Sequence, residues 1–287
     1  MPQIIFVTGA TGTVGSQVIN ELAGKPGIHV RATIRDFMKA AKVGRAGVET
    51  VMFDFGRPDD YRPLLKGVDS VFLVPPFHPW GVEQANVFID TCHAQRVRHV
   101  VKLSVIETCK DITVGRWHSA IDEHLKKSGM KWTILQPTSF MQNLLENSGP
   151  REDDYIHMPA GDAKTAFIDT RDIAAVAALA LTQPGHEGKA YTLTGPEAFD
   201  YKEVAEILSD ATGRMIRYLD VSHSEACQEM IDENLPEWVI DVMMELRSWT
   251  AEGGASQITT TVQDLLGRPG RTLKDFATEF ANHWKHD

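Results

Sequence analysis

Cysteine, long apolar runs and targeting signals are scarce or missing in this chain of 287 residues. Its three cysteines, Cys92, Cys109 and Cys227, are widely spaced and form no C-x-x-C motif, so we expect neither a disulfide framework nor a metal site. The longest apolar run, from 173 to 181, has nine residues, whereas a membrane-spanning helix needs about 20. No basic region followed by a cleavage site opens the chain. We therefore expect a cytoplasmic protein without a membrane partner.

Positive charge is also in short supply. The chain has 29 Lys and Arg residues against 39 Asp and Glu residues, a net charge of −10. Proteins that bind the nucleic-acid backbone need clustered cationic surface, so no nucleic-acid partner is expected. Residues 1–50 instead carry a net positive charge, because they contain six Lys or Arg residues and three Asp or Glu residues. An anionic ligand is therefore expected near the start of the chain.

Motifs of other enzyme classes are missing as well. The sequence has no G-x-S-x-G turn of a hydrolase and no G-x-x-x-x-G-K-[ST] loop of a nucleotide hydrolase. His118 and His124 are six positions apart, so they do not share a helix face that could hold a metal. The sequence therefore gives no support for a hydrolase, a nucleotide hydrolase or a metal-dependent enzyme.

Short β-branched apolar runs that alternate with helical segments fill the first half of the chain. Helical periodicity covers 15–22, 81–93 and 117–127. Repeated strand–helix units of this size predict an α/β fold of the Rossmann type, with a doubly wound parallel sheet. The expected strands are 4–7, 30–34, 50–53, 70–74, 99–103 and 132–135.

The regular alternation of strands and helices ends after Pro137. A short helix over 139–147 and a polar loop are followed by 166–168 and a helix over 172–181, which we expect to return to the main sheet. A late strand over 191–193 and a helix over 201–212 follow, and beyond about Ile216 the segments are helical. The predicted domains are therefore a Rossmann domain and a smaller, mainly helical C-terminal lobe. The first covers 1–137 with return segments about 164–195, and the second covers 138–163 and 196–287.

A glycine-rich loop follows the first predicted strand directly. It reads Thr-Gly-Ala-Thr-Gly-Thr-Val-Gly from position 8, with glycines at Gly9, Gly12 and Gly15. Gly9 allows a tight strand-to-helix turn, Gly12 lets the backbone approach a pyrophosphate, and Gly15 lets helix and strand pack closely. The start of the helix supplies free N–H groups and the positive end of its dipole. This pattern predicts a dinucleotide site.

The end of the second strand indicates which dinucleotide binds. An acidic residue there takes the adenosine ribose hydroxyl of NAD, whereas an Arg accommodates the 2′-phosphate of NADP. Arg35 lies 20 residues after Gly15, and Lys39 follows one helical turn later. Arg presents a planar fork that suits phosphate, which favours NADP(H). NAD is the alternative, with Asp36 taking the hydroxyl.

This constellation resembles the atypical short-chain dehydrogenase/reductases, and within them the NmrA-like group of NADPH:quinone oxidoreductases and triphenylmethane dye reductases. The resemblance covers nearly the whole chain. It is carried by the TGATGTVG loop, Ile34-Arg35, Asp54, the segments 135–137, 140–143 and 167–174, and Leu266-Gly267-Arg268-Pro269 with Phe276.

The resemblance implies roles for residues at the carboxyl ends of the strands, where open α/β sheets bind ligands. Asp54 and Phe55 are expected to line the adenine, although Asp54 also suits a turn cap. The groove beside the nicotinamide is expected at Val74, Pro75 and Pro76, although the two prolines also suit a strand end. The phosphates are expected to contact Thr11, Gly12, Thr13 and Val14.

One departure from the superfamily limits the chemistry. None of the five tyrosines is followed by Lys four positions later, so the usual Tyr-x-x-x-Lys acid is absent. Two functions remain. The first is an NAD(P)H-dependent reductase of electron-poor acceptors such as quinones, conjugated carbonyls or dyes, where binding and orientation supply most of the catalysis. The second is an NADP(H)-binding redox sensor without turnover.

Three polar residues are candidates for the catalytic site. Ser104 ends the fifth strand, where the superfamily keeps a substrate-orienting Ser, and Lys102 lies two residues before it. His118 opens the helix where the Tyr usually stands. Its ordinary pKa near 6.5 suits proton donation at neutral pH. A helix-start His that faces solvent is the alternative.

The candidate acceptor residues are aromatic or contain sulfur. His78 and Trp80 lie on the loop after the fourth strand and are expected to cover the nicotinamide, or else to pack on their own domain. Met141 and Trp238 are expected to line an apolar pocket for a small hydrophobic or aromatic acceptor, although such residues also fill cores. The sequence leaves the oligomeric state open, a homodimer included.

Overall fold

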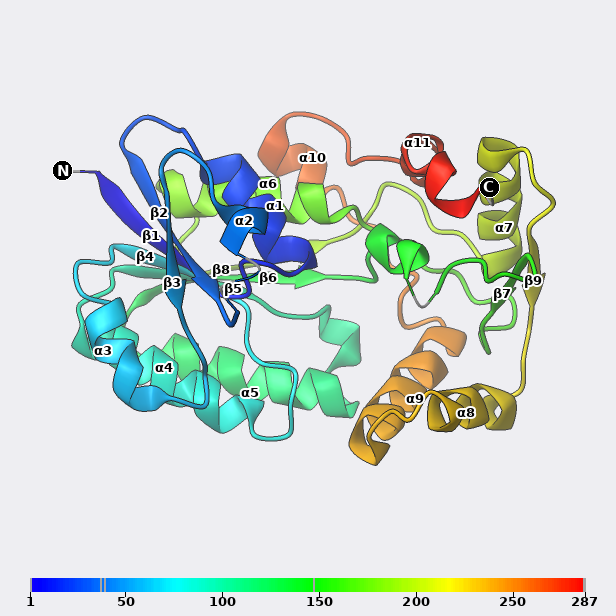
Figure 1. Cartoon of the computed structure of the whole chain (residues 1–287), viewed down its shortest axis with the longest axis horizontal. Coiled ribbons are helices and arrows are strands. Elements are labelled where there is room, and N and C mark those ends of the chain that lie inside the picture. Colours follow the sequence, from blue (N-terminus) through cyan, green and yellow to red (C-terminus); the bar gives the residue numbers. More distant parts are fainter. Residues whose placement is uncertain (1, 37, 39, 147, 286–287) are drawn as a thin grey trace. The chain divides into compact units, whose positions relative to one another are not determined.

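The computed structural model describes residues 2–36, 38, 40–146 and 148–285 (Figure 1). The chain forms two compact units. Unit 1 consists of Met1–Val105, Trp117–Gln136 and Thr170–Tyr191, and unit 2 consists of Ile106–Arg116, Pro137–Asp169 and Thr192–Asp287. No helix among the described residues is both long enough and apolar enough to cross a membrane.

A seven-stranded sheet of order β3-β2-β1-β4-β5-β6-β8 forms the centre of the fold. Neighbouring strands from β3 to β6 run parallel, as the alternation of strands and helices predicts. The order reverses between β1 and β4, which is the point where doubly wound sheets bind nucleotides. The strands are β1 Gln3–Val7, β2 Ile28–Ile34, β3 Val48–Met52, β4 Ser70–Leu73, β5 His99–Leu103, β6 Lys131–Pro137 and β8 Lys189–Leu193.

Helices cover both faces of this sheet (Figure 1). On one face lie α1 (Thr13–Leu22) and α6 (Thr170–Thr182), and on the other lie α3 (Tyr61–Leu64), α4 (Gly81–Ala94) and α5 (Thr113–Lys127). The short α2 (Ala40–Val43) and the 3₁₀ turn η2 (Pro58–Asp60) connect strands. Under α4, the rings of Phe6, Phe53, Tyr61 and Phe88 pack edge-on or tilted at 5.3 to 6.0 Å. Such aromatic packing fixes the sheet that positions the loops at its carboxyl edge.

Unit 2 is mainly helical and has its own core of apolar residues. Its helix α7 starts with a capping box, in which Asp200 accepts from the N–H of Glu203 and the Glu203 side chain reaches back to the N–H of Asp200. The elements of this unit are η3 Glu107–Cys109, η4 Met141–Leu145, β7 Tyr155–His157, α7 Tyr201–Thr212, β9 Arg217–Leu219, α8 His223–Asp232, α9 Glu237–Ala251, α10 Thr261–Leu266, α11 Leu273–Glu279 and η5 Ala281–Trp284.

Two local expectations from the sequence are wrong. Residues 166–168 do not return to the main sheet; Ile168 forms an isolated parallel bridge with Phe140 inside unit 2. The segment after Ile216 is not purely helical, because β9 pairs in parallel with β7 in a second, two-stranded sheet. Both pairings join segments far apart in the chain, so local periodicity carries no signal for them.

The structure also draws the boundary between the units differently from the sequence. Residues 106–116, which the sequence places in the Rossmann domain, belong to unit 2. The reason is polar contact with α9. The indole N–H of Trp249 donates to the carbonyl of Thr108 at 3.0 Å, and the Glu245 carboxylate accepts from the N–H of Thr113 at 2.6 Å.

Candidate functional site

The turn between β1 and α1 is too tight for any residue but glycine at two positions. Gly9 has φ +61°, and a Cβ there would lie 3.1 Å from Cβ of Val74. A Cβ on Gly15 would lie 2.2 Å from the carbonyl oxygen of Gly9, far inside contact distance. Gly9 therefore makes the turn, and Gly15 lets the helix pack on it.

Gly12 occupies a different position in the same turn. It is exposed, it caps α1 without a side-chain hydrogen bond, and its added Cβ would meet only the Gly9 carbonyl at 3.2 Å. The first turn of α1 carries no acidic residue, and backbone N–H groups there lack partners within the helix. An open, side-chain-free helix start of this kind fits a pyrophosphate, with Thr11 half-buried and Thr13 exposed beside it.

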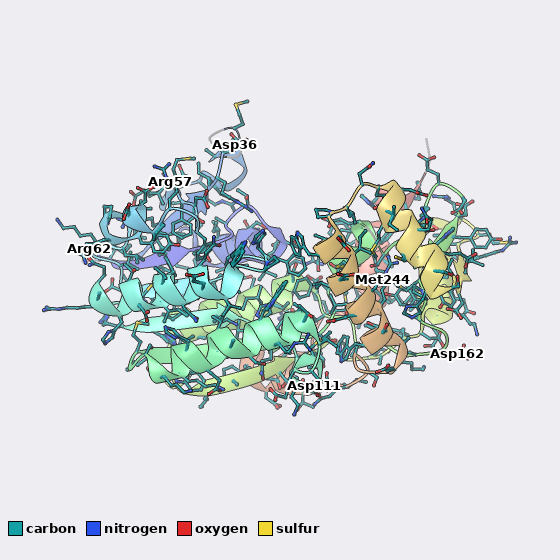
Figure 2. All side chains as sticks on the ribbon, turned by 90° about the horizontal axis from the view of Figure 1, so that it is seen from below. Asp36, Arg57, Arg62, Asp111, Asp162 and Met244 are labelled. Carbon is teal, nitrogen blue, oxygen red and sulfur yellow. The ribbon has the colours of Figure 1, made fainter. Side chains whose placement is uncertain are left out.

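The residues that follow β2 favour a phosphate over a ribose hydroxyl. Arg35 directly follows β2 and is exposed. Asp36, exposed on the loop in Figure 2, accepts a hydrogen bond from the N–H of Met38 at 2.9 Å, so one carboxylate oxygen already caps a turn. Lys39 lies outside the described residues. Arg31 takes no part in this site, because it binds Glu49 at 2.9 Å and the Leu64 carbonyl at 2.6 Å.

The residues expected to line the adenine have structural partners of their own. Asp54 accepts from the N–H of Gly56 at 2.8 Å, which is the turn cap that its position also suited. Phe55 is half-buried, and its ring meets the rings of Phe53 and Phe88 at 4.8 and 5.4 Å. Contact between these two residues and an adenine stays a prediction.

The loop after β4 is anchored to β1 and stiffened by prolines. Thr8 at the end of β1 bridges to it, since its hydroxyl oxygen accepts from the N–H of Val74 at 2.7 Å. Val74, Pro75 and Pro76 are half-buried, and a Cβ on Gly81 would lie 2.3 Å from the Pro76 carbonyl oxygen. This edge of the sheet is therefore held in one conformation beside the glycine turn.

Aromatic side chains stand on this anchored loop. The Trp80 side chain is 65% exposed, and the Phe77 ring, 48% exposed, meets the Trp117 ring edge-on at 5.9 Å. His78 is half-buried, and its Nδ1 accepts from the N–H of Trp80 at 3.2 Å. A rigid loop thus presents flat apolar surface at the carboxyl edge of the sheet.

The three polar residues proposed for catalysis lie together, and Asp122 joins them. Lys102 is fully buried, and its ammonium lies 2.6 Å from Oδ1 of Asp122 and 3.1 Å from Nδ1 of His118. The hydroxyl of Ser104, 3% exposed, donates to Oδ2 of Asp122 at 2.7 Å. We call Lys102, Ser104, His118 and Asp122 the buried polar cluster. Its lysine and serine are enclosed, and only the half-buried His118 retains exposed surface.

The electrostatics of this cluster change the role expected for His118. Burial and the nearby Lys102 ammonium lower the pKa of His118 well below its usual value. The imidazole is therefore neutral at pH 7. This shift does not favour His118 as an imidazolium acid, and a catalytic role for the residue stays a prediction. Burial also lowers the pKa of Lys102, while the Asp122 carboxylate opposes that shift.

The sequence alone does not identify Asp122 as a site residue, although its spacing from His118 is a signal that could have done so. It follows His118 by four positions in α5, which places both on one face of the helix. Because Lys102 lies on β5, only the packing of α5 against that strand reveals the carboxylate that balances the lysine charge.

The remaining acceptor candidates lie in unit 2. Met141 is 1% exposed and packs in the core of this unit, which leaves its thioether little surface for a ligand. Trp238 is half-buried at the start of α9. Trp249 on the same helix is 9% exposed and anchors the 106–116 segment. Acceptor contact by Met141 and Trp238 stays a prediction.

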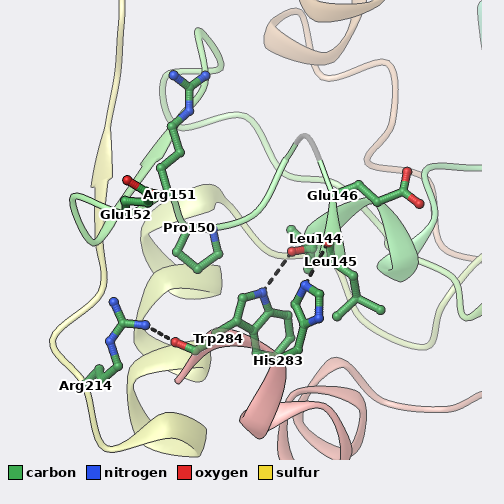
Figure 3. A pocket seen from close by; sticks show the side chains of 9 residues that line it. All are labelled: Leu144, Leu145, Glu146, Pro150, Arg151, Glu152, Arg214, His283 and Trp284. Atoms are coloured by element: carbon green, nitrogen blue, oxygen red, sulfur yellow. Dashed lines mark hydrogen bonds between the residues drawn. The ribbon is translucent and has the colours of Figure 1, made fainter. Parts of the chain in front are cut away.

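Unit 2 also contains a pocket of about 230 Å³ (Figure 3). Two of its polar side chains are engaged in the fold: the Trp284 indole donates to the Leu144 carbonyl at 3.0 Å, and Nε2 of His283 lies 2.9 Å from the Leu145 carbonyl oxygen. None of the residues proposed for cofactor or acceptor binding lines this pocket.

Metal-ligand geometry and reactive thiols give no further site. Among the described residues, no three His, Cys, Asp or Glu side chains are grouped to hold an ion. Burial raises the pKa of Cys92 and of Cys109, so both thiols stay protonated and unreactive at neutral pH.

Comparison with known proteins identifies relatives over nearly the full length. Residues 1–268 match the NmrA-like family. NAD(P)H azoreductase of Xenophilus azovorans is 39% identical over 281 residues, which cover 97% of this chain and 98% of that protein. (4-Alkanoyl-5-oxo-2,5-dihydrofuran-3-yl)methyl phosphate reductase of Streptomyces griseus is 34% identical over 284 residues, which cover 97% of this chain and 98% of that protein. A solved NADPH-dependent quinone oxidoreductase of Escherichia coli matches with TM-score 0.84 and 25% identity, covering 97% of this chain and 99% of that one.

Proposed function

This chain belongs to the NmrA-like family, and from that premise we propose that it reduces flat, electron-poor acceptors with NADPH. It is an NAD(P)H-dependent oxidoreductase, and the relatives are named as an NAD(P)H azoreductase, a phosphate reductase and a quinone oxidoreductase. The observation that carries the proposal is the β1–α1 turn, whose exposed Gly12 and uncapped helix start leave room for a pyrophosphate. The redox-sensor alternative has less support, because the relatives named above are reductases.

In the proposed cofactor complex, three segments at the carboxyl edge of the sheet each bind a different part of NADPH. The start of α1 holds the pyrophosphate through backbone N–H groups. Arg35 takes the 2′-phosphate, because its guanidinium is exposed at the end of β2 while Asp36 caps a turn. Val74, Pro75 and Pro76 form the wall beside the nicotinamide. Held in this way, a reduced nicotinamide would supply a hydride.

The acceptor half rests on the aromatic loop after β4. A two-electron reduction of a quinone, an azo group or a conjugated carbonyl takes up one hydride, which the reduced cofactor would supply, and one proton, which solvent would supply. The exposed Trp80 ring offers a stacking surface for such flat molecules, and His78 holds the backbone of Trp80 in place. His118 supplies a hydrogen bond to the acceptor atom that gains negative charge.

An assay with purified protein tests this function directly. NADPH and then NADH are supplied with a panel of quinones, enones, azo compounds and triphenylmethane dyes, and loss of reduced-nicotinamide absorbance is followed. We expect turnover with at least one class and a preference for NADPH. Tight NADP(H) binding without turnover of any acceptor would refute the reductase and favour the sensor.

The stacking role of Trp80 predicts a selective defect. Trp80→Ala removes an exposed ring, so we expect stability and NADPH affinity near those of the unmodified protein and a KM for aromatic acceptors raised about 5- to 20-fold. The matched control is Met215→Ala, which removes a side chain that is 68% exposed in unit 2. An unchanged KM for every aromatic acceptor would remove Trp80 from the site.

The oligomeric state and the location in the cell stay predictions. A homodimer is one state that size-exclusion chromatography with light scattering distinguishes from a monomer. A cytoplasmic location is proposed on the same footing, and fractionation of the native cell tests it.

A further inference from the structure

The central sheet contains a lysine whose side chain is fully buried. Lys102 belongs to β5, a strand buried along its whole length in the middle of the sheet, and its side chain is fully buried. A buried ammonium is costly unless its charge and all its N–H groups are satisfied. The partners of Lys102 therefore decide what the surrounding groups can do.

Three atoms that can accept a hydrogen bond lie within 3.5 Å of the ammonium nitrogen. They are Oδ1 of Asp122 at 2.6 Å, Nδ1 of His118 at 3.1 Å and the backbone carbonyl oxygen of His118 at 3.5 Å. Because an ammonium can donate but not accept, Nδ1 of His118 acts as the acceptor of this contact. A neutral imidazole whose Nδ1 accepts carries its proton on Nε2.

Asp122 is itself held in place from the other side. Its Oδ2 accepts from the hydroxyl of Ser104 at 2.7 Å, and the N–H of Ser104 donates to the Leu135 carbonyl of β6 at 2.7 Å. A chain of contacts thus runs from β6 through Ser104, Asp122 and Lys102 to the ring of His118. Such a chain fixes both the orientation and the tautomer of the last member.

We propose that Lys102, Asp122 and Ser104 are positioning residues that keep His118 as a neutral imidazole with its proton on Nε2. His118 then acts as a hydrogen-bond donor to the acceptor molecule, and not as an imidazolium acid. The tautomer of His118 follows from the cluster geometry alone. The role of His118 as a donor to the acceptor molecule rests on the reductase function proposed above.

The charged groups around the ring support this assignment. A proton on Nδ1 would place an N–H against the Lys102 ammonium at 3.1 Å, so two donors would face each other. Burial lowers the pKa of His118, and the charge of the Lys102 ammonium lowers it further. Burial lowers the pKa of Lys102, the Asp122 carboxylate opposes this shift, and the charge of Lys126 adds to it. A neutral N–H donor suits an acceptor that gains negative charge as the hydride arrives.

The tautomer can be measured without any acceptor. Protein labelled with ¹⁵N-histidine is examined by long-range ¹H–¹⁵N NMR from pH 5.5 to 8, and the His118→Gln variant identifies the His118 signals among the eleven histidines. We expect an unprotonated Nδ1, a protonated Nε2 and no titration near the ordinary pKa. A protonated Nδ1, or an imidazolium that titrates near 6.5, would overturn the proposal.

Substitution within the cluster tests the cause. Lys102→Met alone leaves Asp122 buried without its charge partner and risks misfolding, so Lys102→Met with Asp122→Asn is the working variant, since Asn still accepts from Ser104. We expect the pKa of His118 to rise and the two tautomers to mix. Lys127→Met is the matched control, because Lys127 is an exposed lysine on α5, the helix that carries His118 and Asp122. A tautomer unaffected by loss of Lys102 would refute the positioning role.

Turnover tests the role of His118 as a hydrogen-bond donor to the acceptor molecule. His118→Gln keeps an N–H donor and should retain kcat within about tenfold, whereas His118→Phe removes it and should lower kcat about a hundredfold or more. The kcat of the unmodified protein should be independent of pH around 6.5. Equal losses in both variants would indicate proton transfer by the ring, and equal full activity would leave the cluster a purely structural role. If no acceptor turns over at all, the reductase function fails while the NMR result still decides the tautomer.

Discussion

Arg35 is the residue that should decide between the two dinucleotides. Its side chain is exposed at the end of β2, while the neighbouring Asp36 already accepts from the N–H of Met38. The sequence left Asp36 open as a binder of the ribose hydroxyl, and the turn geometry weakens that alternative. A charge-assisted hydrogen bond contributes about 1.5 to 3 kcal/mol, which corresponds to about 10- to 100-fold in affinity.

Arg35→Ala should therefore raise the Kd for NADPH by about 10- to 100-fold and the Kd for NADH by less than about threefold. Quenching of intrinsic tryptophan fluorescence measures both constants. Arg98→Ala is a suitable control, because Arg98 is 69% exposed, pairs with Asp69 and precedes β5 at the opposite edge of the sheet. Equal losses for the two cofactors would show that Arg35 does not read the 2′-phosphate.

For His118, the sequence predicts the position of the residue in the site but not the protonation state of its ring. The sequence indicated the right neighbourhood, since Lys102, Ser104 and His118 lie together in the structure. It assigned the ordinary imidazole pKa because nothing local announces a lysine 16 positions earlier in the chain. Only the packing of α5 on β5 places that ammonium against Nδ1.

The β1–α1 turn is the element whose prediction from sequence succeeded most fully. The spacing of its three glycines anticipated a tight turn, an open approach and a close helix–strand contact, and the positions of the added Cβ atoms agree. The reason is that the turn is local: strand, loop and first helical turn are consecutive, and each glycine answers a constraint within a few residues.

Two substitutions in this element should separate folding from binding. Gly15→Ala places a Cβ 2.2 Å from the Gly9 carbonyl, so we expect a loss of about 1 to 3 kcal/mol in the free energy of unfolding. Gly12→Ala meets that carbonyl only at 3.2 Å, so it should unfold nearly normally but bind NADPH at least about tenfold more weakly. Urea unfolding and fluorescence titration of both variants check this. The prediction fails if Gly12→Ala binds NADPH normally.

At the scale of the whole molecule, buried histidines should make the fold sensitive to acid. Burial lowers the pKa of His99 to about 4, and its Nε2 lies 2.9 Å from the Thr133 hydroxyl. Glu187 opposes this shift, and Lys131 and His186 add to it. In the unfolded chain the pKa returns to about 6.5, so the unfolded state binds the extra proton as the pH falls through that value.

The stability contributed by a neutral His99 is therefore present above pH 6.5 and lost as the pH falls towards 4, by about 3 kcal/mol over that range. Urea unfolding at pH 7 and at pH 4.5 should show a smaller decrease for His99→Gln than for the unmodified protein. His93→Gln, which alters an exposed histidine, should leave the decrease unchanged. An identical decrease in all three proteins would contradict the assignment.

The sequence by itself determined the features that are local or periodic. The parallel sheet, the glycine turn, Arg35 at the end of β2 and the likeness to the NmrA-like family all follow from consecutive residues, and the structure and the family match confirm the fold and the family. Tertiary structure decided what depends on distant contacts. It paired β7 with β9, moved 106–116 to unit 2, buried Met141 and set Asp122 and Lys102 around His118. Burial and charge act through space, so a group's protonation state becomes defined only when the chain has folded.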